Sequence, residues 1–290
     1  MKRIAVVARD DRGDAAGVVT ALLGWLWERG LTAVLDQGTA SLVAALGRSP
    51  ALEVVERDAL ARHADLIDVL GGDGTLLAVA RLVDGLDVPI LGVNLGGLGF
   101  LTATTLEALY PTLETVLRGQ YQAEARMLLR ARLLRNGVTV AEHLALNDVV
   151  LAKGALGRLI ELEVRMDGQP MTAYRADGLI IATPTGSTAY NLSAAGPILF
   201  PTMDALVLTP ICSHALTNRP IALPGTAVLA VTLLSDNPDV VLSVDGQSGP
   251  RVTARDVLAV EQSPARIRLI RDPQKTYFQV LRTKLKWGER

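Results

Sequence analysis

The chain has 290 residues, of which 49% are hydrophobic, and its net charge at pH 7 is −1. This length suffices for one large domain or two ordinary ones, with a sizeable core. The near-neutral charge argues against bulk attraction to nucleic acid or acidic membrane, and no apolar run is long enough to span a bilayer. The single cysteine, Cys212, excludes an internal disulfide framework and suits a reducing compartment. We therefore expect a cytoplasmic protein with no nucleic-acid or membrane partner.

The first third of the chain alternates strand and helix patterns. Mainly apolar runs predict strands over residues 3–8, 32–36, 65–70 and 88–94, and helical spacing appears over residues 15–30 and 40–46. Strands that are apolar throughout and alternate with helices indicate a parallel sheet covered on both faces. Residues 1–119 are therefore predicted to form an α/β domain, which ends in a helix over residues 105–119.

A different pattern follows the first domain. Ile160, Leu162 and Val164 alternate with polar residues, as in a strand with one buried face. Asn136-Gly137 and Asp167-Gly168 are typical of tight hairpin turns. We predict a second, mainly antiparallel β domain over residues 120–274. Residues 275–290 look helical and are expected to return to the first domain.

The turn Gly71-Gly72-Asp73-Gly74-Thr75 joins a predicted strand to a predicted helix. Such turns attract phosphate through backbone N–H groups and the helix N-terminus, yet a carboxylate would repel it. The turn has neither the Walker A pattern nor the dinucleotide-binding glycine spacing. Either Asp73 caps the helix, or it accepts a proton from an attacking hydroxyl or helps to hold a metal. A second glycine-rich stretch, residues 95–102, follows another strand at the same edge of the sheet.

Residues 177–197 run from a buried strand into Pro-Thr-Gly-Ser-Thr and reach Tyr190, whose ring could lie against a base or ribose. A ligand-binding loop explains the whole run, whereas a helix cap or a serine/threonine turn explains only single residues. The second glycine of a serine-hydrolase elbow is absent after Ser187. We therefore favour a ligand-binding loop.

Asn147 and Asp148 interrupt an apolar run, where adjacent side chains of a strand face opposite sides. Both offer directional hydrogen bonds that suit adenine and ribose hydroxyls, although a bulge or a loop edge is the alternative. His63, His143 and His214 are far apart in the sequence and do not have metal-ligand spacing. With a single cysteine in the chain, no structural zinc site is expected, and the sequence shows no dedicated carboxylate cage for a metal.

The chain resembles the NAD kinase family of bacterial type over nearly its whole length. The segments that carry the resemblance are GGDGT, GVNLGGLGFLT, LNDVVL, RADGLIIATPTGSTAYNLSAAGPI, SHALTNRPI, VDGQ and FQVLRTKLKW. The resemblance implies transfer of the ATP γ-phosphoryl group to the 2′-hydroxyl of the adenosine ribose of NAD, which gives NADP. It also implies a Rossmann-like N-terminal domain, a β-rich C-terminal domain, Mg²⁺ that arrives with ATP, and a homodimer or homotetramer.

The resemblance assigns the catalytic role to Asp73, as base or orienter of the attacking hydroxyl. An arginine at position 175 is associated in the family with preference for NAD over NADH. The residues that the resemblance assigns to NAD binding are Asp73, Gly74, Asn147, Asp148, Arg158, Arg175, Asp177, Thr188, Ala189, Tyr190, Asn191, Leu192, Ser193 and Gln247. Two alternatives remain at this point: a lipid kinase of the diacylglycerol type, which could share the glycine turn, and a non-enzymatic NAD(P) sensor.

Overall fold

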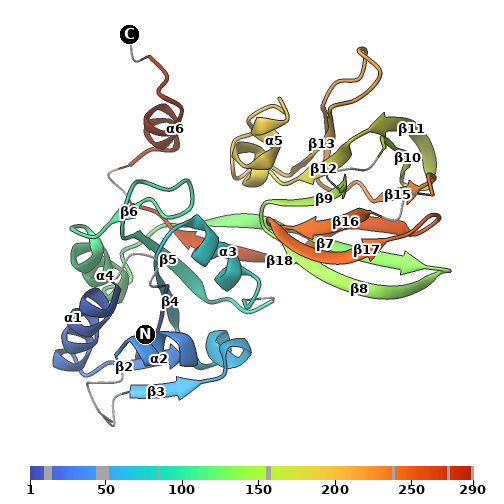
Figure 1. Ribbon diagram of the computed structural model, residues 1–290. Coiled ribbons are helices and arrows are strands. Elements are labelled where there is room, and N and C mark those ends of the chain that lie inside the picture. The colour runs from blue at the N-terminus through green and yellow to red at the C-terminus, as the bar shows by residue number, and fades with distance from the viewer. Residues whose placement is uncertain are drawn as a thin grey trace. The chain divides into compact units, whose positions relative to one another are not determined.

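The computed structural model describes residues 1–9, 15–43, 52–83, 85–154, 158–236, 239–272 and 275–288. The chain folds into two compact units (Figure 1). The first consists of Met1–Ala125 together with Ile267–Arg290, and the second of Arg126–Arg266. Within the described ranges, no helix has the length and apolar character needed to cross a membrane.

A parallel sheet forms the centre of the first unit. Its strand order is β18-β5-β4-β1-β2-β3, with β6 beside β5, and these neighbours pair in parallel. The strands are β1 (Arg3–Ala8), β2 (Thr32–Asp36), β3 (Leu52–Val55), β4 (Leu66–Leu70), β5 (Pro89–Asn94), β6 (Thr104–Thr105) and the end of β18 (Val257–Ile270). The strands predicted in this region are confirmed, because their mainly apolar runs allow burial on both faces.

Helices α1 and α4 pack apolar side chains onto this sheet. Helix α1 ends close to Gly30, whose φ of +68° favours glycine. Helix α2 starts earlier than predicted because the Asp36 carboxylate accepts a hydrogen bond from the Thr39 N–H at 2.8 Å; residues 44–46 of the predicted helix lie outside the described residues. Helix α4 is shorter than predicted because Thr105 pairs with β5. The helices of this unit are α1 (Ala15–Glu28), α2 (Gln37–Leu42), η2 (Arg57–His63), α3 (Asp73–Ala80), α4 (Leu109–Leu117) and α6 (Tyr277–Leu285).

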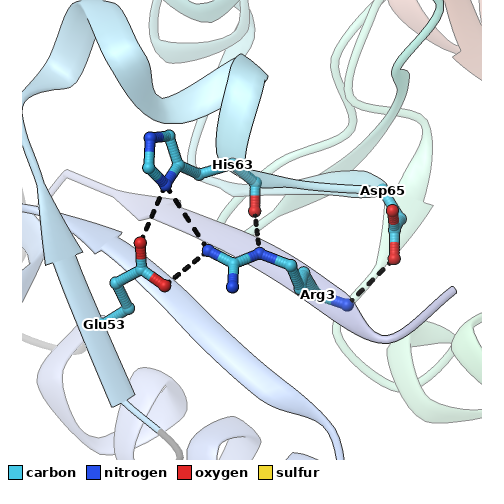
Figure 2. Close-up of polar contacts among 4 residues, drawn as sticks. All are labelled: Arg3, Glu53, His63 and Asp65. Carbon is cyan, nitrogen blue, oxygen red and sulfur yellow. Dashed lines mark hydrogen bonds and ion pairs between the residues drawn. The ribbon is translucent and has the colours of Figure 1, made fainter.

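A polar network holds the edge strand β3, for which the sequence carries no clear signal (Figure 2). Arg3 on β1 forms an ion pair with Glu53 on β3, and its Nε donates a hydrogen bond to the His63 carbonyl at 2.6 Å. His63 Nδ1 lies 2.8 Å from a Glu53 carboxylate oxygen, and the Lys2 and Arg3 N–H groups donate to Asp65 at 2.6 and 3.1 Å. The hydrogen bond from Arg3 lowers the pKa of Glu53. Arg3 therefore reaches past β2 and ties β3 to the middle of the sheet.

The second unit contains two layers of strands. One layer has the order β11-β10-β15-β18, with β7 beside β18 and β8 beside β7; the other has the order β14-β13-β12-β9-β16-β17 and is antiparallel throughout. The strands are β7 (Ala123–Arg135), β8 (Val138–Ala145), β9 (Asp148–Lys153), β10 (Ile160–Met166), β11 (Gln169–Ala176), β12 (Gly178–Ala182), β13 (Ala205–Ile211), β14 (Ile221–Pro224), β15 (Leu229–Leu233), β16 (Val240–Val244), β17 (Gln247–Val252) and β18. Apolar side chains from both layers form one core cluster.

Hairpin turns shape this unit, two of them at the Asn-Gly and Asp-Gly pairs where the sequence predicts them. Asn136, Asp167 and Asp245 have φ values of +52°, +51° and +49°, and a glycine with positive φ follows each of them. Consecutive residues with positive φ suit the right-handed twist of the flanking strands. Together with the buried alternation of Ile160 and Leu162, these turns confirm the predicted antiparallel β domain.

Both boundaries between the two units differ from the predicted ones, and in each case the first unit is larger than predicted. Arg268 and Leu269 pair with Pro89 and Ile90 of β5, and the Arg271 N–H donates to the Gln122 carbonyl at 3.0 Å. The end of β18 therefore belongs to the first unit, which resumes at Ile267 rather than at residue 275. At the first crossing the first unit extends to Ala125, past the predicted end at residue 119.

Candidate active site

The turn after β4 does not use Asp73 as a cap for the helix that it begins. Helix α3 begins at Asp73, and its N-cap is Gly72, which has no side chain to cap with. Gly71 is required for close packing, since a Cβ there would lie 2.7 Å from Thr75 Oγ1. The alternative that Asp73 only caps its own helix is therefore wrong.

The Asp73 carboxylate binds the second glycine-rich stretch. One oxygen, Oδ2, accepts a hydrogen bond from the Phe100 N–H at 2.9 Å. The other, Oδ1, accepts from the Leu101 N–H at 3.1 Å, the Thr102 N–H at 3.0 Å and the Thr102 hydroxyl at 2.9 Å. Gly99 is required here because a Cβ would lie 2.2 Å from Asp73 Oδ1. The two glycine-rich stretches expected at one sheet edge are thus joined through Asp73.

Asn94 shapes the same loop from the end of β5. Its Oδ1 accepts a hydrogen bond from the Gly96 N–H at 2.7 Å, and its Nδ2 donates to Thr102 Oγ1 at 2.9 Å. Asn94, Gly99 and Thr102 were not among the predicted site residues, although all three lie in the GVNLGGLGFLT segment. Gly99 and Thr102 matter because they contact Asp73, which lies more than twenty positions earlier in the sequence, and Asn94 acts through its bond to Thr102. Contacts at such a separation leave no local signal in the sequence.

In the second unit, Asn147 and Asp148 mark a break between strands. Strand β8 ends at Ala145 and β9 begins at Asp148, so the loop-edge alternative is correct for Asn147. Asp148 is only 3% exposed. Burial raises the pKa of Asp148 to about 7, the nearby Asp245 charge adds to the rise, and a hydrogen bond from the Tyr190 backbone opposes it.

The loop that follows β12 (η3, Gly186–Thr188, and α5, Tyr190–Ser193) packs against this break. A Cβ on Gly186 would lie 2.0 Å from the Asn147 carbonyl oxygen, so only glycine fits. Tyr190 is 46% exposed, while its backbone contacts Asp148. The structure therefore brings the predicted loop together with Asn147 and Asp148.

Asn191 has a structural role that the sequence did not predict. Its side chain is fully buried, and its Nδ2 donates to the Ser187 and Pro197 carbonyls at 3.0 and 3.1 Å. Its Oδ1 accepts from the Thr209 hydroxyl at 2.6 Å. These bonds use both amide hydrogens and the amide oxygen, so the side chain stabilises the loop.

The other predicted residues lie on several elements. Gly74 is the second residue of α3, Arg175 lies near the end of β11, and Gln247 is the first residue of β17. Asp177 lies between β11 and β12 and forms an ion pair with Lys153 at 3.2 Å. Arg158, Arg175 and Gln247 have exposed side chains.

Arg126 is a buried cation that sequence reasoning missed. It is 8% exposed, and its Nη1 lies 3.4 Å from the hydroxyl of Thr185 in the predicted loop. Later arginines of the same strand, such as Arg130 and Arg132, alternate with apolar residues and look like the solvent-exposed face of a strand. Arg126 was therefore not recognised as a buried residue. Among the residues that the structure describes, no three histidine, cysteine, aspartate or glutamate side chains gather as a metal site. Asp73 with its glycine-rich stretches, and Asn147 and Asp148 with the loop after β12, offer carboxylates, amides and backbone donors. These groups suit hydroxyl and nucleotide ligands.

Two family models match the chain: the ATP-NAD kinase N-terminal domain over residues 4–121 and the ATP-NAD kinase C-terminal domain over residues 146–272. Proteins named NAD kinase from Geotalea daltonii and Syntrophotalea carbinolica are each 49% identical to the chain over 290 residues, with 100% of both chains covered. A protein of that name from Solibacter usitatus is 43% identical and covers 100% of this chain and 99% of its own.

Solved structures confirm the fold. A yeast NADH kinase in complex with NADH has a TM-score of 0.92 at 24% identity, covering 100% of this chain and 89% of its own. An NAD kinase from Archaeoglobus fulgidus in complex with ATP has a TM-score of 0.72 at 23% identity, covering 98% of each chain. The Rossmann-like unit and the β-rich unit are thus an established combination. On the evidence of both family models and of the full-length relatives, the chain belongs to the ATP-NAD kinase family.

Proposed function

We infer that the chain transfers the γ-phosphoryl group of ATP, supplied with Mg²⁺, to the 2′-hydroxyl of the adenosine ribose of NAD and so forms NADP. The named relatives at 47–49% identity over the full chain are NAD kinases. Neither the family models nor these relatives support the lipid kinase or the non-enzymatic sensor. The observation that carries the proposal is the Asp73 carboxylate, which is held in place at the start of α3 beside the glycine turn.

Asp73 is proposed as the group that accepts or orients the attacking hydroxyl. Phosphoryl transfer needs little covalent chemistry from a protein, and catalysis comes mainly from positioning and electrostatic stabilisation. Its bonds to Phe100, Leu101 and Thr102 fix the direction of the carboxylate before a substrate arrives. A preset acceptor lowers the cost of reaching a reactive geometry. Asp73 therefore fits the role of orienter as well as that of base.

We propose that NAD is bound by the residues that the family resemblance assigns to it. Asn147 and Asp148 are proposed to bind adenine and ribose hydroxyls, and the exposed ring of Tyr190 to lie against the nucleotide. For Asn191 the backbone is the proposed contact, since its side chain is used within the fold. The further proposed contacts are Gly74, Arg158, Arg175, Asp177, Thr188, Ala189, Leu192, Ser193 and Gln247. We also propose a homodimer or homotetramer that works in the cytoplasm, where the exposed thiol of Cys212 would stay reduced.

The direct test is NADP formation from NAD, ATP and Mg²⁺, followed with an NADP-specific dehydrogenase. Asp73→Asn should bind NAD normally and lower turnover by roughly 10²–10⁴-fold, the usual range for loss of a general base. Asp87→Asn is the matched control, because this exposed carboxylate of the same unit pairs with Arg268 on the surface, and it should leave turnover unchanged.

The outcomes separate the function from the role of Asp73. A folded protein that binds NAD but forms no NADP would contradict the kinase activity and revive the sensor. Normal turnover in Asp73→Asn would leave the kinase activity intact and refute the role of this carboxylate. Weaker NAD binding with normal turnover of bound NAD would make Asp73 a binding group only.

A further inference from the structure

The backbone of Leu146, Asn147 and Asp148, at the break between β8 and β9, is held by two other residues. The Asp245 carboxylate accepts hydrogen bonds from the N–H groups of all three, at 3.0, 2.7 and 3.2 Å in chain order. The Leu146 carbonyl accepts from the Thr183 hydroxyl at 2.6 Å and the Asn147 carbonyl from the Thr183 N–H at 2.9 Å. The Asp148 carbonyl accepts from the Asp245 N–H at 3.0 Å. Every polar backbone group of the segment is therefore paired.

Asp245 and Thr183 occupy equivalent places on either side of β9. In the sheet, β9 lies between β12 and β16. Asp245 follows the last residue of β16, and Thr183 follows the last residue of β12. Beyond the ends of those ladders the chain entering β9 would have unpaired N–H and carbonyl groups, which are costly where water is excluded. Each neighbouring strand thus supplies one residue that continues the hydrogen bonding past its own end.

The burial, backbone conformation and charge of Asp245 all suit this contact. It is only 9% exposed, and its φ of +49° forms part of the hairpin turn after β16. Its carboxylate lies within hydrogen-bond distance of the backbone of Leu146–Asp148. A carboxylate can accept from several N–H groups at once, whereas an amide of the same shape has one acceptor oxygen and carries two hydrogens. Hydrogen bonds to an ionised acceptor are also roughly twice as strong as neutral ones.

We propose that Asp245, supported by Thr183, is the positioning residue for the NAD-contacting pair Asn147 and Asp148. The inference rests on the proposed function, which assigns adenine and ribose to this pair. Because the backbone is fully satisfied by Asp245 and Thr183, the direction of both side chains is set before NAD arrives. Asp245 acts through the pair and does not itself touch the reacting atoms.

The test is Asp245→Asn, compared with Asp167→Asn as the matched control. Asp167 also begins an Asp-Gly turn in this unit, with φ of +51°, and its carboxylate accepts the Val228 N–H at 2.9 Å, away from the segment. Asp245→Asn should raise KM for NAD roughly 10–100-fold, as expected for loss of charged hydrogen bonds that position a binding group, and change kcat at saturating NAD far less. Asp167→Asn should leave both constants at their parent values.

Thr183 gives a second, independent pair of variants in case Asp245→Asn lowers the folded fraction, which circular dichroism and a thermal melt would show. Thr183→Val removes the donor to Leu146 and the acceptor for the Gly186 N–H at 3.0 Å, and should also raise KM for NAD selectively. Thr183→Ser keeps the hydroxyl and should restore the parent KM.

The outcomes distinguish this inference from the function on which it rests. No NADP formation by the parent chain would overturn the proposed function itself. An active parent chain whose folded Asp245→Asn and Thr183→Val variants keep the parent KM for NAD would overturn only the positioning role. A loss of kcat at unchanged KM in these variants would overturn it as well, whereas a selective rise in KM that Thr183→Ser reverses supports it.

Discussion

A single carboxylate shows how the site is organised at the scale of residues. Asp73 begins α3, where a negative charge is favourable to the helix but unfavourable to a nearby phosphate. Its oxygens accept hydrogen bonds from the backbone of Phe100–Thr102. The carboxylate therefore organises the second glycine-rich stretch while it remains the proposed acceptor of the substrate hydroxyl. Both tasks depend on Gly99, which lets the loop come close.

Gly99→Ala tests this arrangement, with Gly97→Ala as the matched control. A Cβ at Gly99 would lie 2.2 Å from Asp73 Oδ1 and 2.3 Å from Thr102 Oγ1, whereas a Cβ at Gly97 has no neighbour within 4 Å. We expect Gly99→Ala to displace the carboxylate and lower turnover by roughly 10²-fold, the effect of a misplacement of about 1 Å. Steady-state kinetics of NADP formation would measure it. Equal activity of the two variants would show that the carboxylate need not be held there.

At the scale of an element, strand β4 carries a buried acid in the middle of a hydrophobic sheet. Asp68 is fully buried, and neither carboxylate oxygen has a hydrogen-bond partner among the described residues. It faces the same side as Leu66 and Leu70, which belong to the core beneath α1 and α4. Burial alone raises the pKa of Asp68 to about 8. The strand therefore holds this group protonated at neutral pH, at a cost to stability.

Asp68→Val should stabilise the protein in a pH-dependent way. Between pH about 4 and about 8 the unfolded chain releases the Asp68 proton and the folded chain keeps it, so the free energy of unfolding falls as pH rises and then levels off. The gain from Asp68→Val should therefore be small near pH 4 and reach about 4 kcal/mol at pH 7, an upper value from 1.36 kcal/mol per pH unit. Urea unfolding at several pH values would measure it.

Asp65→Asn, at the start of the same strand region, is the control of opposite sign. Hydrogen bonds from the Lys2 and Arg3 backbone lower the pKa of Asp65, so its contribution to stability is present above its ordinary pKa and is lost as pH falls. Asp65→Asn should therefore destabilise at neutral pH and have little effect in acid. A constant difference between Asp68→Val and the parent across this range would contradict the buried, protonated state.

At the scale of the whole molecule, the chain passes between the two units twice. Strand β7 starts in the first unit and continues in the second, and β18 returns from the second unit to the first. The end of β18 pairs with β5 and so adds the last strand to the parallel sheet. The first unit is therefore completed by residues that come after the entire second unit.

Truncation should reveal this dependence. A chain that ends after Arg266 loses the part of β18 that pairs with β5, although β4 and β6 still pair with β5. A chain that ends after Asp272 keeps all of β18 and loses only the C-terminal residues beyond it, α6 included. We expect amide hydrogen exchange in β5 to be about fivefold faster in the shorter chain, since one backbone hydrogen bond contributes about 1 kcal/mol. Equal protection of β5 in the two chains would show that the sheet does not need β18.

Much of the fold and part of the site could be predicted from the sequence because they depend on local patterns. Apolar runs predicted the parallel strands and glycine after Asn136 and Asp167 predicted the hairpins, since periodicity and backbone conformation act over a few neighbouring residues. The placement of Asp73 on a strand–turn–helix unit is equally local. The composition and the motif order also determined the two-domain plan and the family.

Only the tertiary structure decided how distant residues share their polar groups. Asp73 meets Thr102, 29 positions later, and Asp245 meets Leu146, 99 positions earlier. It also decided that the Asn191 side chain is consumed within the fold and that Asp68 is buried without a hydrogen-bond partner among the described residues. A hydrogen bond depends on distance and direction in space, and local sequence carries neither. The sequence thus determined which elements form and which chemistry they carry, and long-range contacts decided which side chains are left to meet a substrate.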